Sequence, residues 1–207
     1  MIGFHDCLKL SRKIPISNRI RRVPMSFHNF SIILERGRPA AKRVVVGSDR
    51  VSTIDQAKRI GYETNILERV HKVKHPSSHQ KKTRNESGTS GVSSGNESEN
   101  KPPPEKWVEQ AVDEILHLKI LESLFDTEVP SVITIASGDA AESEYSGGFM
   151  KMVERALQKG WHVEVVSFVK NTSNSYRNRN FTSKWGSLFR WIPLDDYVED
   201  LVDDQLE

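Results

Sequence analysis

The chain has 207 residues, and its 30 Lys and Arg nearly balance its 28 Asp and Glu, which excludes a histone-like polycation and an acidic solubilising protein. Hydrophobic residues make up 36%. This is below the roughly 45–50% of globular domains, a figure that also counts Gly, so we expect part of the chain to be unfolded. The single cysteine, Cys7, excludes an internal disulfide, and no apolar run approaches the roughly 20 residues that span a bilayer. Because the first ten residues are too polar for a signal peptide, we expect an intracellular protein, cytoplasmic or nuclear.

Charge is unevenly distributed along the chain. Residues 1–75 carry 16 Lys and Arg against 6 Asp and Glu, whereas residues 76–207 carry 14 against 22. A basic first part favours an anionic partner. The alternative is a mixed surface whose charges neutralise one another within the fold.

The first third of the chain predicts a parallel strand pair. Residues 1–25 are basic with weak periodicity, and we expect them to be weakly structured. Ser26 is expected to cap a helix over residues 27–36. The run Val44–Val46 predicts a buried strand, a short helix follows it, and residues 62–70 predict the next strand. A strand–helix–strand order requires a parallel crossover.

The segment from residue 75 to residue 105 is rich in Ser, Asn, Gly, Glu and Pro. Such a composition buries too little apolar surface to offset the entropy of ordering, and it predicts a disordered loop. An interdomain linker is the alternative. We prefer an insertion within one domain, because the pieces on its two sides are predicted to be halves of one sheet.

The second part of the chain continues the alternation of helices and strands. We expect a long helix over 105–125, a strand over 131–136, a helix over 148–159, a strand over 162–169, a short edge strand over 192–194 and an acidic C-terminal helix over 195–207. Alternating units of this kind predict an α/β fold, a three-layer sandwich around a mainly parallel sheet, within a domain of residues 26–199.

Carboxylates form the candidate site. In open α/β sheets, ligands bind beyond the carboxyl ends of the strands, and Asp139 directly follows the predicted strand 131–136. Glu109 and Asp113 are four residues apart, which places them on one face of the predicted helix. Carboxylates that converge from different elements suit Mg²⁺ or Mn²⁺. The alternative is that Asp139 caps its turn and that the two helix acids are solvated.

Several motifs together resemble the NYN-domain ribonucleases of the PIN-like superfamily, in particular the eukaryotic, fungal type. They are V-x-x-A-V-D-E-I-L-H-L-K-I from Val108, I-A-S-G-D-A-A-E-S-E-Y-S-G-G-F from Ile135 and A-L-Q-K-G-W-H-V-E-V-V-S-F from Ala156. The upstream G-R-P-A-A-K-R-V-V-V-G-S and the downstream S-x-x-Y-R, F-x-S-K-W and I-P-L-D-D-Y also fit. The resemblance covers roughly residues 27–199 apart from the loop.

This resemblance implies a PIN-like Rossmannoid fold and metal-dependent cleavage of RNA. By motif, Asp113 and Asp139 are the implied metal-binding and catalytic acids, and Glu109 is a further candidate ligand. The family's first strand ends in Asp-x-Ser-Asn, a motif that this chain lacks. Many relatives also have an acid soon after the S-G-D motif, where this chain has Ala140 and Ala141. Glu142 or Glu144 could substitute, and Glu144 is included among the candidate ligands.

Basic residues after the strand 162–169 are the candidates for RNA binding. Those expected to hold phosphates are Lys170, Arg177, Arg179, Lys184 and, from the first part of the chain, Arg43. The mixture of amides, bases and aromatics in residues 171–185 is typical of a surface for single-stranded RNA, with Tyr176 or Trp185 under a base. The alternative is a polar loop in which Phe181 and Trp185 pack into the core.

Three functions remain open at this point. The first is a Mg²⁺- or Mn²⁺-dependent ribonuclease, with either an intact site or a weakened or incomplete one. The second is a PIN-like module that binds RNA without turnover. The third is a protein-interaction domain. The first requires the carboxylates of Asp113 and Asp139 to point toward one another at the carboxyl edge of the sheet, together with a third acid.

Overall fold

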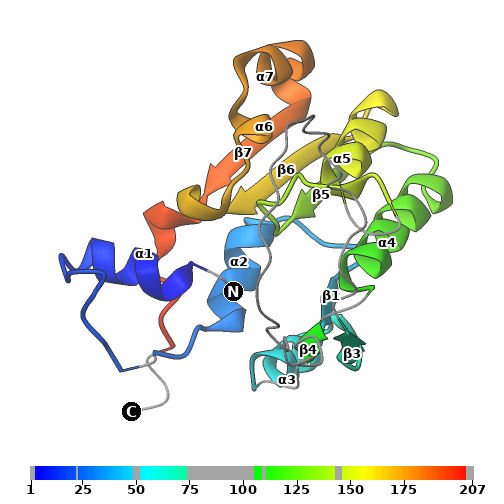
Figure 1. The fold of residues 1–207 in the computed structure, drawn as a ribbon. Coiled ribbons are helices and arrows are strands. Elements are labelled where there is room, and N and C mark those ends of the chain that lie inside the picture. The colour runs from blue at the N-terminus through cyan, green and yellow to red at the C-terminus, as the bar shows by residue number, and fades with distance from the viewer. Residues whose placement is uncertain are drawn as a thin grey trace, which may run out of the picture.

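The computed structural model describes residues 3–21, 23–48, 52–73, 105–108, 111–142 and 146–203. The helices are α1 Phe4–Ser11, α2 Phe27–Glu35, α3 Ser52–Arg59, α4 Val112–Asp126, α5 Gly148–Gln158, α6 Asn174–Arg177 and α7 Arg179–Trp185. The strands are β1 Val44–Gly47, β2 Glu63–Ile66, β3 Val70–Val73, β4 Glu105–Val108, β5 Val132–Ile135, β6 His162–Ser167 and β7 Phe189–Pro193 (Figure 1).

Most strand pairs are parallel, as the sequence predicts. Strands β5, β6 and β7 form one parallel sheet in that order, and β1 pairs with β2 in parallel through the crossover helix α3. Strands β3 and β4 form an antiparallel pair. We expected the two parts of the chain to share one sheet, but within the described residues no strand ladder joins β1–β2 to β5–β7.

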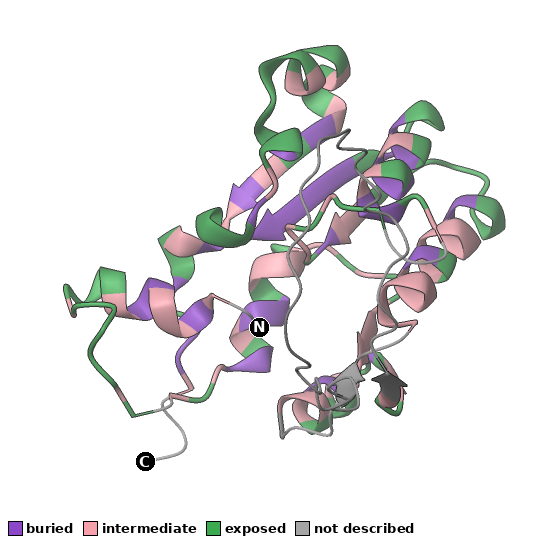
Figure 2. Cartoon of the chain, viewed as in Figure 1, coloured by how far each residue is buried: buried purple, intermediate pink, exposed green. Residues whose placement is uncertain are grey.

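Helices cover both faces of the sheet β5–β7. Strand β6 is buried after its first residue (Figure 2). Val163 and Val165 pack on one face with residues of α4 and α5, whereas Val166 packs on the other face with residues of α1 and α2. The alternation of side chains along a strand explains why one strand contributes to both cores. The chain is therefore a three-layer α/β protein with mainly parallel strands, as predicted.

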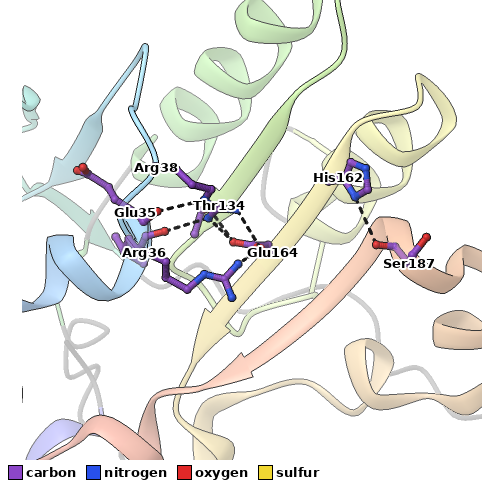
Figure 3. Close-up of polar contacts among 8 residues, drawn as sticks. Glu35, Arg36, Arg38, Thr134, His162, Glu164 and Ser187 are labelled. Carbon is purple, nitrogen blue, oxygen red and sulfur yellow. Dashed lines mark hydrogen bonds and ion pairs between the residues drawn. The ribbon is translucent and has the colours of Figure 1, made fainter.

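A buried carboxylate joins the segment between α2 and β1 to this sheet. Glu164 lies in the middle of β6, where its side chain is only 9% exposed. Arg38 donates to both of its carboxylate oxygens, at 3.2 and 2.6 Å, and Arg36 also pairs with it. Figure 3 shows both arginines reaching Glu164 beside Thr134 of β5. This ion-pair cluster links elements more than 120 residues apart in sequence.

Three segments differ from the sequence-based expectation. Residues 105–108 form strand β4 rather than the start of a long helix, because they pair with β3, and Ala111 has a left-handed φ of 63° just before α4 begins. Phe4–Ser11 forms helix α1 within the segment expected to be weakly structured. Its Phe4 and Leu8, one helical turn apart, are 2% and 0% exposed, so burial of their side chains stabilises the helix.

The acidic end of the chain is the third difference. Instead of a long helix, it forms the 3₁₀ helix Leu194–Tyr197, followed by turns and a bridge between Met25 and Val202. Leu194, Val198, Leu201 and Val202 are buried, so tertiary packing sets the conformation of this segment. The predicted disordered loop lies outside the described residues, apart from Glu105. In the described part of the chain, no helix is long and apolar enough to cross a membrane.

Candidate site at the carboxyl edge of the sheet

Asp139 lies in an exposed turn just beyond the carboxyl end of β5. Its Oδ1 accepts a hydrogen bond of 2.8 Å from the backbone N–H of Ala141, and its own N–H donates to the Ser137 hydroxyl at 3.3 Å. These are the bonds of an Asp-stabilised turn, as in the capping alternative. They leave most acceptor positions of the carboxylate facing solvent, because Asp139 itself is exposed.

The backbone of this turn is fixed by the segment after β6. Gly138 packs so closely on Asn171 and Thr172 that a Cβ at this position would overlap with the Asn171 carbonyl. The Ser173 N–H donates to the Gly138 carbonyl at 2.8 Å. The turn is therefore held on one side by backbone contacts that only glycine permits.

Tyr176 of α6 supports the turn from the core. Its side chain is fully buried, and its hydroxyl donates to the carbonyl of Asp139 at 2.8 Å. Burial, and to a lesser degree the negative charge of Asp139, raises the pKa of Tyr176, so this hydroxyl stays protonated and keeps donating. The prediction that Tyr176 could lie under an RNA base is wrong, because no part of the ring reaches the surface.

The other side of the turn packs against the start of α5. Gly148 has a φ of 72°, and a Cβ there would overlap with the Ala141 carbonyl. Just before it, the Ser146 hydroxyl lies 2.7 Å from Nδ1 of His117, a buried residue of α4. Burial lowers the pKa of His117, and the nearby charges of Asp113 and Glu114 oppose this effect.

These contacts connect the two predicted acids through a chain of packed residues. Asp113 lies in the first turn of α4, one turn before His117, and is partly buried. His117 bonds Ser146, which precedes Gly148, and Gly148 packs on the turn of Asp139. The structure thus places Asp113 and Asp139 on elements that contact one another. The convergence of their two carboxylates stays a prediction.

Of the remaining predicted ligands, only Glu142 lies within the described residues. Helix α4 begins at Val112, so the four-residue spacing of Glu109 and Asp113 does not lie within one helix. Glu109 and Glu144 both lie outside the described residues. Glu142 is exposed. In the ranges that the structure describes, no three His, Cys, Asp or Glu side chains gather in a group that could hold a metal ion.

The predicted RNA-binding residues extend from the end of β6 to α7. Lys170 follows β6 and forms an ion pair of 2.6 Å with Asp6 of α1. Arg177 donates to Asn174 at 2.8 Å, and its guanidinium lies 5.5 Å from the centre of the Trp191 ring. Arg179 is exposed at the start of α7. Because Tyr176 contacts Asp139, Arg177 lies on a helix beside the Asp139 turn.

Lys184 lies further along α7, with its ammonium 4.7 Å from the centre of the Trp185 ring. Figure 1 shows α7 beside the beginning of β7, at the opposite end of that strand from α1. Phe181 and Trp185 are partly buried against the core, in agreement with the packing alternative. Arg43 pairs with Glu35 at 2.7 Å and is therefore not part of this basic strip, which we define as Lys170, Arg177, Arg179 and Lys184.

Comparison with known proteins adds no assignment. No family model matches the chain, and comparisons with curated proteins and with solved structures found no match.

Proposed function

We propose that this chain is a ribonuclease that cleaves single-stranded RNA with the help of Mg²⁺ or Mn²⁺ at Asp139. The observation that carries the proposal is the Asp139 turn. Its backbone is fixed by Gly138 and Tyr176, while its carboxylate is exposed and has no basic partner among the described side chains. A rigid, exposed carboxylate beyond a parallel strand suits a ligand at the sheet edge.

The donor chemistry fits a hard divalent cation. Asp139 and Asp113 offer carboxylate oxygens, the ligands that Mg²⁺ and Mn²⁺ prefer, and the resemblance to NYN-domain proteins selects the same two residues. When bound, such an ion lowers the pKa of a coordinated water and offsets charge on the phosphate. The basic strip would hold the flanking phosphates, and Arg177 lies nearest in sequence to the Tyr176 that fixes the turn.

A second candidate function is RNA binding without turnover. It is favoured by the finding that, in the described ranges, no three His, Cys, Asp or Glu side chains form a group that could hold a metal ion. In this function the ligand is also single-stranded RNA, but only the basic strip would bind it. RNA affinity in this case would not depend on Asp139.

A cleavage assay distinguishes the two. Purified protein is incubated with single-stranded RNA and Mg²⁺ or Mn²⁺, with and without EDTA. The ribonuclease proposal expects cutting that EDTA stops and that Asp139→Asn largely removes, because Asn keeps the shape but loses the charge. The matched control is Asp126→Asn, an exposed aspartate at the far end of α4, which should cut like the wild type. RNA binding without metal-stimulated cutting would favour the second candidate.

A further inference from the structure

Helix α1 lies across the end of the sheet where the candidate site is located. Phe4 and Leu8 are buried in the same core cluster as Phe168, the residue that follows β6. At the start of the helix, Gly3 has a φ of 96°, and a Cβ there would overlap with the side-chain oxygen of Asn171. The helix is thus packed firmly against the segment that follows β6.

The exposed side of α1 places an acid on the basic strip. Asp6 forms a 2.6 Å ion pair with the Lys170 ammonium, and the two side chains are 38% and 61% exposed. The hydrogen bond and charge of Lys170 hold the pKa of Asp6 below its ordinary value. The carboxylate of Asp6 is therefore paired with Lys170 at a position that is open to solvent.

This ion pair is close to the Asp139 turn. Asn171, the residue after Lys170, touches both Gly3, just before α1, and Gly138 of the turn. A phosphate that reaches Lys170 would therefore lie at the same sheet edge as the proposed cleavage site. It would also meet the negative charge of Asp6.

We propose that Asp6 occupies Lys170 in place of an RNA phosphate, so that α1 weakens the chain's own RNA binding. This inference rests on the proposed function and concerns the regulation of the same site. Carboxylate and phosphate oxygens both accept hydrogen bonds from an ammonium. An exposed ion pair contributes little stability, so a phosphate can replace the carboxylate by rotation of side chains alone.

The helix itself need not leave. The burial of Phe4 and Leu8 and the three hydrogen bonds from Arg12 to Glu199 keep α1 in place while Asp6 turns away. The exchange is local, and it predicts an effect of the Asp6 charge on RNA affinity without a change of fold.

The test measures the affinity of the full chain for a single-stranded oligonucleotide in EDTA, where cleavage is stopped. Asp6→Asn should tighten binding about two- to fivefold, the range for losing a competing exposed ion pair. The slope of log K against log salt should steepen by about 0.7, equal to one more neutralised phosphate on a single strand. In a Lys170→Ala background, Asp6→Asn should change affinity much less.

Asp126→Asn is the matched control. It removes one exposed negative charge at the end of α4 rather than the one that pairs with Lys170. If it tightens binding as much as Asp6→Asn, the effect is one of net charge, and the inference is overturned. Unchanged affinity in Asp6→Asn also overturns it while leaving the proposed function intact. If neither wild type nor Asp6→Asn binds RNA, both proposals fail.

Discussion

Replacement of Glu164 by Gln should destabilise the fold measurably, because the carboxylate charge is buried between two arginines. Breaking a buried ion pair by removing one partner costs about 3–5 kcal/mol. Here Arg36 and Arg38 are 33% and 36% exposed, so water can reach them in the variant. We therefore expect the loss to be about 2–3 kcal/mol, in the range of hydrogen bonds to charged groups.

Thermal unfolding followed by circular dichroism measures this loss. For a chain of this size, each kcal/mol corresponds to about 2–4 °C, so the midpoint of Glu164→Gln should fall by about 4–12 °C. The control Glu199→Gln removes an exposed ion pair worth at most about 1 kcal/mol and should shift the midpoint by less than about 4 °C.

The dependence on pH provides a separate test of the same cluster. Burial acts to raise the pKa of Glu164, but the hydrogen bonds and charges of Arg38 and Arg36 outweigh it and hold the pKa below its ordinary value. The ion pairs therefore stabilise the fold fully above the unfolded pKa of about 4.3, and this stabilisation is lost as the pH falls through the folded pKa. The difference between wild type and Glu164→Gln should shrink in acid. A variant as stable as the control, or a difference that does not change with pH, would refute this reasoning.

Three further outcomes follow from contacts around the sheet edge. Gly138→Ala should lower the free energy of unfolding by about 1–3 kcal/mol and reduce RNA cleavage, because the added Cβ overlaps with backbone atoms. Urea unfolding measures the first effect, and a cleavage assay measures the second. Tyr176→Phe should cost about 0.5–1.5 kcal/mol by the same unfolding measurement, since it removes the hydrogen bond to the Asp139 carbonyl, and no loss would show that the bond is not made. Burial, followed by the neighbouring Asp195, raises the pKa of Cys7 to about 12, so a thiol reagent at pH 8 should modify it only as the chain unfolds. Rapid modification of folded protein would contradict the packing of α1.

The sequence predicts the elements whose signal is local. Strands β1, β5 and β6 are predicted from the valine run of β1, the apolar run before Asp139 and the alternation in β6. Ser26 caps α2 as expected, and its side chain accepts a hydrogen bond from the Asn29 N–H. The position of Asp139 in a turn beyond a strand follows from the same patterns.

Features that depend on distant partners could not be predicted. Nothing near Glu164 in sequence indicates that Arg36 and Arg38 neutralise it, because these residues are brought together only by the fold. The sequence pattern predicts that the helix of α4 starts at residue 105, but α4 begins at Val112, because residues 105–108 pair with β3 and this pairing overrides their helical pattern. The polar residues around Tyr176 in sequence predict an exposed ring that could lie under an RNA base, but they do not reveal that the side chain is buried. Its contact with Asp139 spans 37 residues.

Binding of Mn²⁺ to the Asp139 turn tests the ribonuclease proposal most directly. The paramagnetic ion broadens NMR signals near its site, so a titration should first broaden the backbone amides of Gly138, Asp139 and Ala141. This effect should persist in Asp126→Asn and disappear in Asp139→Asn. Broadening that is confined instead to the acidic segment from Asp195 to Asp203, or that is unchanged in Asp139→Asn, would contradict a metal site at this turn.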